Sequence, residues 1–240
     1  MTDLIRTLRT TGAVREFLPD AVGDDVVARI LDTARFAPSG GNRQGWRIVV
    51  VRDPERRRRL RDLYLVGWYE YLAMRAAGLV PWAPITDRAR EAEAVASVEP
   101  TPNPGGFAEH LDQVPVLLAL FADLRALAAV DRDGDRYSFA GGASVYPFAW
   151  SILLAAREEG LAGVITTMAI REERAVKELF DAPEELALAA VLALGRPVEQ
   201  PTRLTRAAVS DFTTVDSVGG SAFGEGYASA RSASPAPRQS

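Results

Sequence analysis

"FAPSGGNRQGWRIVVV", residues 36–51, joins a helix-like segment to a strand-like one and carries the most specific pattern in the chain. Pro38 ends the helical pattern, and "WRIVVV" at 46–51 predicts a buried β-strand. The glycines between them let a backbone approach a planar ligand closely. Asn42 and Gln44 offer paired donor and acceptor groups that suit the edge of a pyrimidine or flavin ring. An ordinary turn is the alternative.

The segments on either side of this stretch predict a single α+β domain. Apolar residues at 24–34 recur at helical spacing, and residues 3–9 suit a short helix. Downstream, the patterns predict helices at 54–77, 139–163 and 171–180 and strands at 114–123, 163–167 and 185–195. The 139–163 helix is apolar on most faces, which favours a buried dimer seam, with the central helix of a monomer core as the alternative.

Two segments interrupt this regular alternation. Residues 78–110 are rich in proline and contain Gly105 and Gly106, so we expect an insertion or lid inside one domain that spans residues 1–215. From residue 216 the composition changes to small, polar residues. This change predicts a flexible C-terminal tail over residues 216–240.

The composition excludes several kinds of chemistry. The 240 residues include no cysteine and one histidine, His110, which leaves no thiol nucleophile, no disulfide and no thiolate metal site. No GxSxG motif accompanies His110, so we expect a surface or loop-end histidine. "DRDGDRYS" at 131–138 lacks the glycine and glutamate that a calcium loop needs, and we expect no metal.

The charge pattern argues against nucleic acid and membranes as partners. The net charge is −4, and the run Arg56–Arg59 opens a helix-like segment, where a solvated face explains it. The N-terminus has no apolar signal segment, and no stretch of about 20 uncharged apolar residues occurs. We therefore expect a soluble, cytoplasmic protein.

A chain without its own reactive group usually takes its chemistry from a cofactor. Two further segments suit the phosphate of such a cofactor. "TTGAVREF" at 10–17 offers hydroxyls, N–H groups and Arg15, with a helix end closed by Gly12 as the alternative. "TRLTR" places Arg203 and Arg206 one helical turn apart, with a solvated basic turn as the alternative.

The order of these segments resembles the FMN-dependent nitroreductase superfamily, which includes nitroreductases, flavin reductases and iodotyrosine deiodinase. The resemblance rests on "AVREF", "APSGGNRQGWRIVVV", "GVITT" and "GRPV…RLTRAAVSDF", and covers residues 2–212 apart from 78–110. It implies a nitroreductase-like fold with a central mixed sheet flanked by helices. It also implies an intertwined homodimer with two FMN molecules in the interface, each touched by both chains.

Carried over position by position, the resemblance assigns cofactor contacts to four segments. The residues expected along the flavin ring are Pro38, Ser39, Gly40, Asn42 and Gln44. The residues expected over the N5 edge of the flavin are Ile165, Thr166 and Thr167, with Thr167 near N5 itself. Those around the phosphate are Thr11, Gly12, Ala13, Arg15, Arg203 and Arg206.

The N-terminal phosphate motif departs from the family pattern. Arg-Arg-Ser-x-Arg is common there, and only the last position, Arg15, matches in this chain. Because two arginines and a hydroxyl are missing, we expect Arg203 and Arg206 to neutralise more of the phosphate's negative charge, with Arg9 as a further candidate.

The implied activity is that of an FMN-dependent NAD(P)H oxidoreductase. NADH or NADPH reduces the flavin and leaves, and a small-molecule acceptor such as a nitroaromatic or quinone then takes the electrons, which gives ping-pong kinetics. The cofactor carries the chemistry, so no catalytic side chain is expected, and Arg15 supplies positive charge near the flavin N1 side. The alternatives are a flavin-binding or storage protein without turnover and a narrow-purpose FMN dehydrogenase or dehalogenase.

Overall fold

A computed structural model of the chain describes residues 4–97, 101–135 and 139–224. It divides into two compact units, Met1–Thr202 and Arg203–Ser240. In the second unit the described start of the expected tail forms a turn, in which Thr214 bridges Ala222 and the Val215 N–H donates to the Ser221 carbonyl at 2.9 Å. Residues 225–240 of that expected tail lie outside the described residues.

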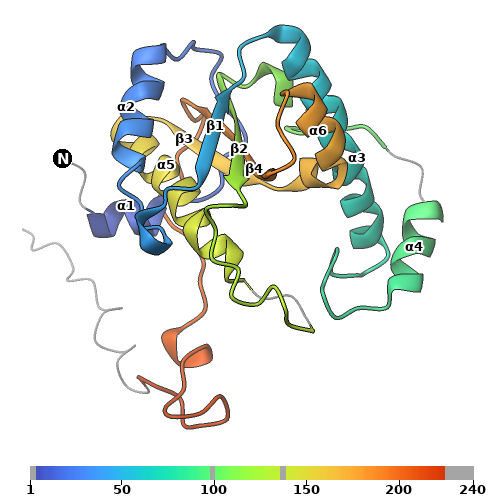
Figure 1. Cartoon of the computed structure of the whole chain (residues 1–240), viewed down its shortest axis with the longest axis vertical. Coiled ribbons are helices and arrows are strands. Elements are labelled where there is room, and N and C mark those ends of the chain that lie inside the picture. Colours follow the sequence, from blue (N-terminus) through green and yellow to red (C-terminus); the bar gives the residue numbers. More distant parts are fainter. Residues whose placement is uncertain (1–3, 98–100, 136–138, 225–240) are drawn as a thin grey trace, which may run out of the picture. The chain divides into compact units, whose positions relative to one another are not determined.

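The first unit is built on a four-stranded sheet (Figure 1). Its strands lie in the order β1 (Trp46–Val50), β2 (Val116–Asp123), β4 (Leu186–Gly195) and β3 (Ala162–Thr166). The α+β class is confirmed. All three neighbouring pairs of strands are antiparallel, whereas a mixed sheet was expected, and an isolated bridge between Ala13 and Gly163 is parallel.

Helices cover both faces of the sheet (Figure 1). One layer contains α2 (Asp24–Ala34) and α5 (Tyr146–Glu158), and the other contains α3 (Pro54–Ala76) and α6 (Glu173–Leu179). In β2 alternate side chains enter the two layers: Leu118 and Leu120 pack with α2 and α5, and Leu117 packs with α3. A strand covered on both faces needs apolar residues at every position, which explains the continuous run over 116–122.

The structure corrects two expectations about buried elements. β1 is half-exposed rather than buried, because it is an edge strand that pairs only with β2 among the described residues. The expected helix over 139–163 is shorter. α5 covers only Tyr146–Glu158, after a 3₁₀ turn at Gly141–Ser144, and the chain then turns at Gly160, whose φ is +70°. Glycine tolerates this left-handed conformation without steric cost.

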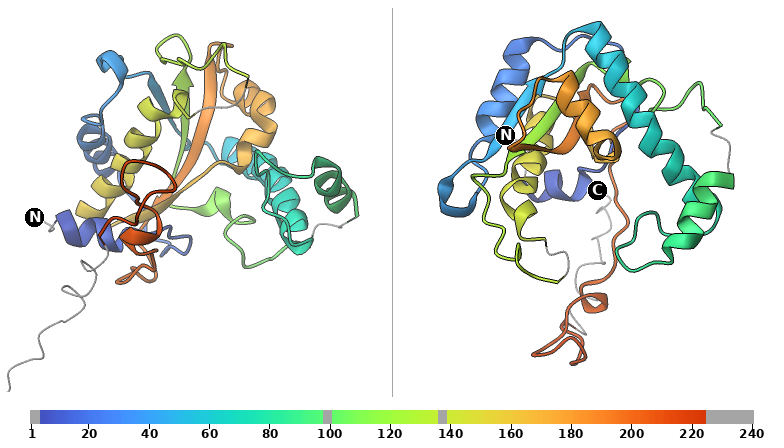
Figure 2. Two further views of the ribbon diagram at one scale, coloured as in Figure 1. Left: turned by 90° about the horizontal axis from the view of Figure 1, so that it is seen from below. Right: turned by 45° about the vertical axis from the view of Figure 1, so that its right-hand side comes forward.

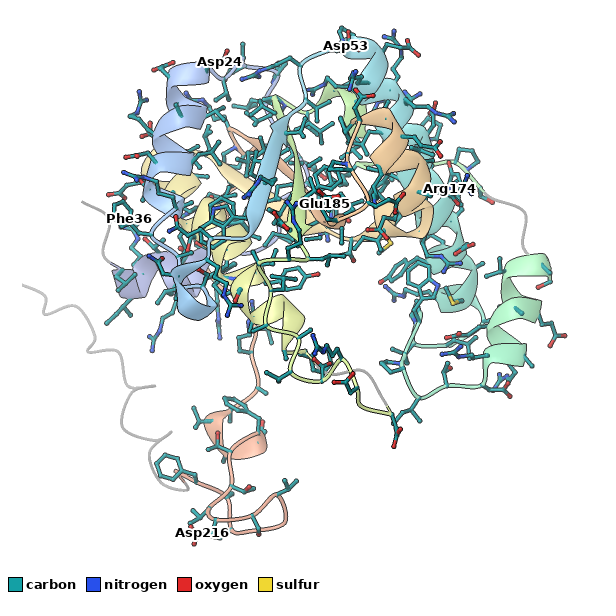
Figure 3. The ribbon with its side chains drawn as sticks, viewed as in Figure 1. Asp24, Phe36, Asp53, Arg174, Glu185 and Asp216 are labelled. Carbon is teal, nitrogen blue, oxygen red and sulfur yellow. The ribbon has the colours of Figure 1, made fainter. Side chains whose placement is uncertain are left out.

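Of the remaining helices, α3 begins at a capping residue. Asp53 lies at the N-terminal end of α3 (Figure 3), and its carboxylate accepts a hydrogen bond from the Arg56 N–H at 2.8 Å. α1 spans Leu4–Thr10, close to the expected range. The segment 78–110 contains α4 (Arg88–Ser97), which the sequence analysis did not predict.

Candidate active site

The loop before β1 is held in a defined shape by its own polar groups. The Ser39 hydroxyl accepts from the Gln44 N–H at 3.0 Å, and the Ser39 carbonyl accepts from the Asn42 N–H at 2.9 Å. The Gly40 N–H donates to the Ser144 hydroxyl at 2.9 Å, which ties the loop to the turn before α5. Sequence analysis missed Ser144, because no local pattern pairs residues about a hundred positions apart.

Three residues of this loop adopt left-handed backbone conformations. Gly41 has φ +61°, Asn42 +52° and Gln44 +48°. Non-glycine residues adopt this region at a steric cost, and such strain concentrates at binding sites. The Gln44 amide donates to Asn42 Oδ1 at 3.2 Å, so the two side chains that we expected at a ring edge bond to each other here.

The N-terminal segment lies along the other edge of the sheet. The Val14 N–H donates to the Gly163 carbonyl at 2.9 Å, beside the Ala13–Gly163 bridge. Thr11 is buried, and both its N–H and its hydroxyl donate to the Thr7 carbonyl. The alternative reading expected Gly12 to close this helix end, whereas Thr11 makes both hydrogen bonds back to the helix. The Thr11 hydroxyl is therefore already engaged.

The segment after β3 is anchored on the α3 side of the sheet. Thr166 is 9% exposed, and its hydroxyl donates to the Tyr64 hydroxyl at 3.3 Å. Ile165 faces the α2–α5 layer instead, and Thr167 is exposed at the start of a 3₁₀ turn over Met168–Glu172. Tyr64 was not among the expected site residues, because a tyrosine inside a helical pattern carries no sign of what it contacts.

Arg15 is a cation whose charge acts on Tyr64. Burial raises the pKa of the Tyr64 phenol, while the hydrogen bond to Thr166 and the positive charge of Arg15 oppose that rise. Arg15 is exposed and also lines a cavity of about 770 Å³, within the size range of small-molecule sites. The aromatic side chains of Trp68 and Phe107 line the same cavity.

His110 also lines this cavity, and its ring is held by neighbouring groups. Nδ1 lies 3.0 Å from the Gln113 amide nitrogen, and Nε2 contacts the Pro104 carbonyl. These bonds agree with the expected loop-end histidine. Within the three described ranges, no group of three or more His, Asp or Glu residues has metal-binding geometry, and no helix is long and apolar enough to cross a membrane.

The expected site residues fall into separate places. Arg15 and Thr166 lie at the β3 edge, whereas residues 38–44 lead into β1 at the opposite edge (Figure 2). Neighbouring strands are about 4.8 Å apart, so the two edges are separated by about 14 Å. Arg203 and Arg206 belong to the second unit, where the Arg206 guanidinium donates to the Thr205 carbonyl.

The Nitroreductase family model matches residues 8–196. The chain belongs to the nitroreductase family. It is accordingly an FMN-dependent oxidoreductase. The match includes the N-terminal segment, the 38–44 loop and the end of β3, and stops before Arg203 and Arg206.

Curated nitroreductase relatives are similar over most of their length. An NADH dehydrogenase of Thermus thermophilus is 30% identical over 188 residues, which cover 78% of this chain and 83% of the relative. A 5,6-dimethylbenzimidazole synthase of Rhodospirillum rubrum is 29% identical over 201 residues, with 78% of each chain covered. A solved structure of iodotyrosine deiodinase bound to FMN and 3-iodo-L-tyrosine has a TM-score of 0.59 at 22% identity. It covers 86% of this chain and 96% of that one, and supports the fold.

The residues present suit the flavin that the family uses. The 38–44 loop offers an exposed, preformed backbone with left-handed residues, and Arg15 is an exposed cation whose charge acts on Tyr64. The phosphate end is less complete, because Thr11 bonds to its own helix and no arginine occupies positions 11–13. Within residues 11–44, these observations therefore fit a site for the flavin ring better than a site for its phosphate.

Proposed function

We propose that this nitroreductase uses NADH or NADPH to reduce electron-poor acceptors such as nitroaromatics or quinones. The observation that carries the proposal is the strained, self-bonded loop at residues 38–44, placed within the matched family region. A backbone held in left-handed conformations by several hydrogen bonds is preorganised, so a planar ring would bind without the cost of ordering the loop.

We infer that each FMN contacts two chains of a homodimer. In one chain, residues 38–44 lead into the edge strand β1, whereas Arg15 and Thr166 lie at the β3 edge, and the two edge strands are about 14 Å apart. Two copies related by a two-fold axis would bring the loop of one beside the Arg15 edge of the other. This arrangement supports the shared site that the family resemblance implies.

The chain's own residues would position and polarise the cofactor. Gly40 and Gly41 permit close backbone approach, Asn42 and Gln44 offer amides to the ring edge, and Arg15 contributes positive charge at the N1 side. Thr167 would offer its N–H or hydroxyl at N5. Arg203 and Arg206 would bind the phosphate. When bound, FMN supplies the two-electron chemistry, so no side chain acts as a nucleophile.

The visible spectrum of the purified protein, followed by anaerobic titration with NADH and NADPH, tests this function. We expect bound FMN whose absorbance bleaches with at least one nucleotide, and ping-pong kinetics once an acceptor is added. A colourless protein that cannot be reconstituted with FMN would contradict the proposal.

Two other functions have specific support. The engaged Thr11 hydroxyl and the missing N-terminal arginines favour weaker phosphate binding, which suits a flavin-binding or storage protein without turnover. The similar dimethylbenzimidazole synthase and iodotyrosine deiodinase favour a narrow-purpose FMN dehydrogenase or dehalogenase. Bound FMN that neither nucleotide reduces would support the first, and turnover of one acceptor in an anaerobic screen would support the second.

A further inference from the structure

Helix α3 is pressed against the chain that follows β3. A Cβ atom built on Gly67 would lie 2.4 Å from the Met168 carbonyl oxygen and 2.9 Å from Arg171 Cγ. Only glycine leaves room for this approach, because real Cβ atoms essentially never come within 3.0 Å of another heavy atom. The backbone of α3 at Gly67 therefore packs directly against the 3₁₀ turn at Met168–Glu172.

Tyr64 lies one turn before Gly67 on the same face of α3, since residues three apart are neighbours on a helix surface. Tyr64 is 3% exposed, and its hydroxyl accepts the 3.3 Å hydrogen bond from Thr166. Phe107 contacts the Tyr64 ring edge-on, with centroids 6.4 Å apart. The phenol is thus fixed by packing on one side and contacts the last residue of β3 with its hydroxyl.

Thr166 has little freedom to lie elsewhere. Its backbone pairs with Val191 in β4, and its side chain points to the α3 layer. Thr167 follows directly with φ −117° and ψ 4°, outside regular strand or helix. The direction of the Thr167 N–H and side chain therefore depends on how Thr166 is held.

We propose that Tyr64 is a positioning residue for the flavin N5 edge, acting through Thr166 on Thr167. The proposal rests on the FMN function proposed above. Oxidised N5 has a lone pair that accepts a hydrogen bond, whereas reduced N5 carries a hydrogen. A donor held at N5 therefore stabilises the oxidised form, and loosening that donor raises the reduction potential.

The first test measures the midpoint potential of bound FMN in wild type, Tyr64→Phe, Thr166→Val and the double variant. Loss of one hydrogen bond changes an equilibrium by about 2- to 10-fold. At 29.6 mV per tenfold for a two-electron couple, we expect each single variant to raise the potential by about 10–30 mV. The double variant should equal either single variant, because both remove the same interaction.

Tyr69→Phe is the matched control. Tyr69 lies on the same helix, but its hydroxyl bonds to Glu109 at 3.4 Å rather than to β3. Its flavin potential should equal that of wild type. Hydrogen exchange on FMN-free protein gives a second readout, in which the Met168–Glu172 amides should exchange faster in Tyr64→Phe than in Tyr69→Phe.

The outcomes separate the two proposals. Wild-type protein that binds no FMN overturns the proposed function and, with it, the role of Tyr64. Wild-type protein that binds FMN, with Tyr64→Phe at the wild-type potential, overturns only the role of Tyr64, even if hydrogen exchange increases. Additive shifts in the double variant would also overturn it, because the two hydroxyls would then act separately.

Discussion

Arg57 shows how a single side chain joins distant parts of this fold. Its guanidinium donates to the Asp112 carbonyl at 2.7 Å, to the Val51 carbonyl at 2.9 Å and to the Val114 carbonyl. The group is partly buried, and burial is the main cause that lowers its pKa. One cation thus satisfies backbone acceptors at the end of β1 and before β2.

We expect Arg57→Ala to lower the free energy of unfolding by about 2–4 kcal/mol, because three carbonyls lose a charged donor and only some can turn to water. Urea denaturation followed by circular dichroism measures the change. Arg58→Ala is the control: its partner Glu55 is exposed on the same helix turn, so the expected effect is within about 0.5 kcal/mol. If both variants lost the same free energy of unfolding, the three hydrogen bonds to backbone carbonyls would contribute little to stability.

Asp123 gives the protein a defined acid sensitivity. Its hydrogen bond to Arg125, with further attraction from Arg47, lowers the pKa of the Asp123 carboxyl from 3.8 to about 2. A lowered pKa stabilises the fold at pH values above about 4, and this contribution is lost as the pH falls from about 4 through 2. We expect Asp123→Asn to flatten the dependence of unfolding free energy on pH between 5 and 2. An unchanged slope in that range would exclude Asp123 as its source.

Among the secondary-structure elements, α3 makes one contact that requires a glycine, at Gly67. Gly67→Ala would favour helix formation by about 1 kcal/mol, but its Cβ would meet the Met168 carbonyl at 2.4 Å. Because that neighbour is backbone and cannot rotate away, we expect a net destabilisation of about 1–3 kcal/mol in chemical denaturation. Val66→Ala, on the exposed side of the same helix, should change stability by no more than about 0.5 kcal/mol. A stabilised Gly67→Ala variant would mean that the turn after β3 yields easily.

Local sequence patterns predicted most helices and strands, but not which of their faces are buried by the rest of the fold. Apolar spacing located α2 and β2 because both bury the faces that the pattern marks. β1 has a similar β-branched run, but its edge position is decided by which strands pair, and that depends on distant residues. α4 escaped prediction because its arginine, glutamate and alanine residues bury only Ala94 among the described helix positions.

The candidate site was predictable only as separate pieces of sequence. The unusual run at 38–44 marked the loop, whose left-handed backbone fits the glycine and amide residues found there. The sequence could not indicate that the Thr11 hydroxyl bonds to Thr7, or that Tyr64 reaches Thr166. Contacts between residues 102 positions apart in the chain arise from packing, which no local pattern records.

At the scale of the whole molecule, the first unit exposes apolar side chains on the neighbouring helices α1 and α5. Leu4 and Leu8 of α1 are 66% and 44% exposed, and Trp150 of α5 is 36% exposed. The Arg157 guanidinium donates to the Thr10 hydroxyl at 3.3 Å, which joins these helices. Contiguous exposed apolar patches mark protein interfaces, so we propose Leu4, Leu8 and Trp150 as candidate contacts of the proposed homodimer.

We expect sedimentation equilibrium to give twice the chain mass of 26.0 kDa for the wild-type protein. Leu8→Asp should shift the mass toward that of one chain, because it places a charge in an apolar interface. FMN affinity should fall in the same variant if two chains form each site. Val66→Asp adds the same charge on the outer face of α3 and should remain dimeric. A dimeric Leu8→Asp protein would place the interface elsewhere.

The two edges of the sheet also differ in how they resist self-association during synthesis and storage. The N-terminal segment covers part of β3 through the Ala13–Gly163 bridge, whereas β1 is an edge strand with the sequence WRIVV. Arg47 is the only charge in that strand, and charged residues on edge strands hinder intermolecular β-pairing. We therefore expect concentrated Arg47→Val protein to become turbid and bind amyloid dyes sooner than wild type. The solubility of the protein would then depend on an arginine that follows the 38–44 loop in the sequence.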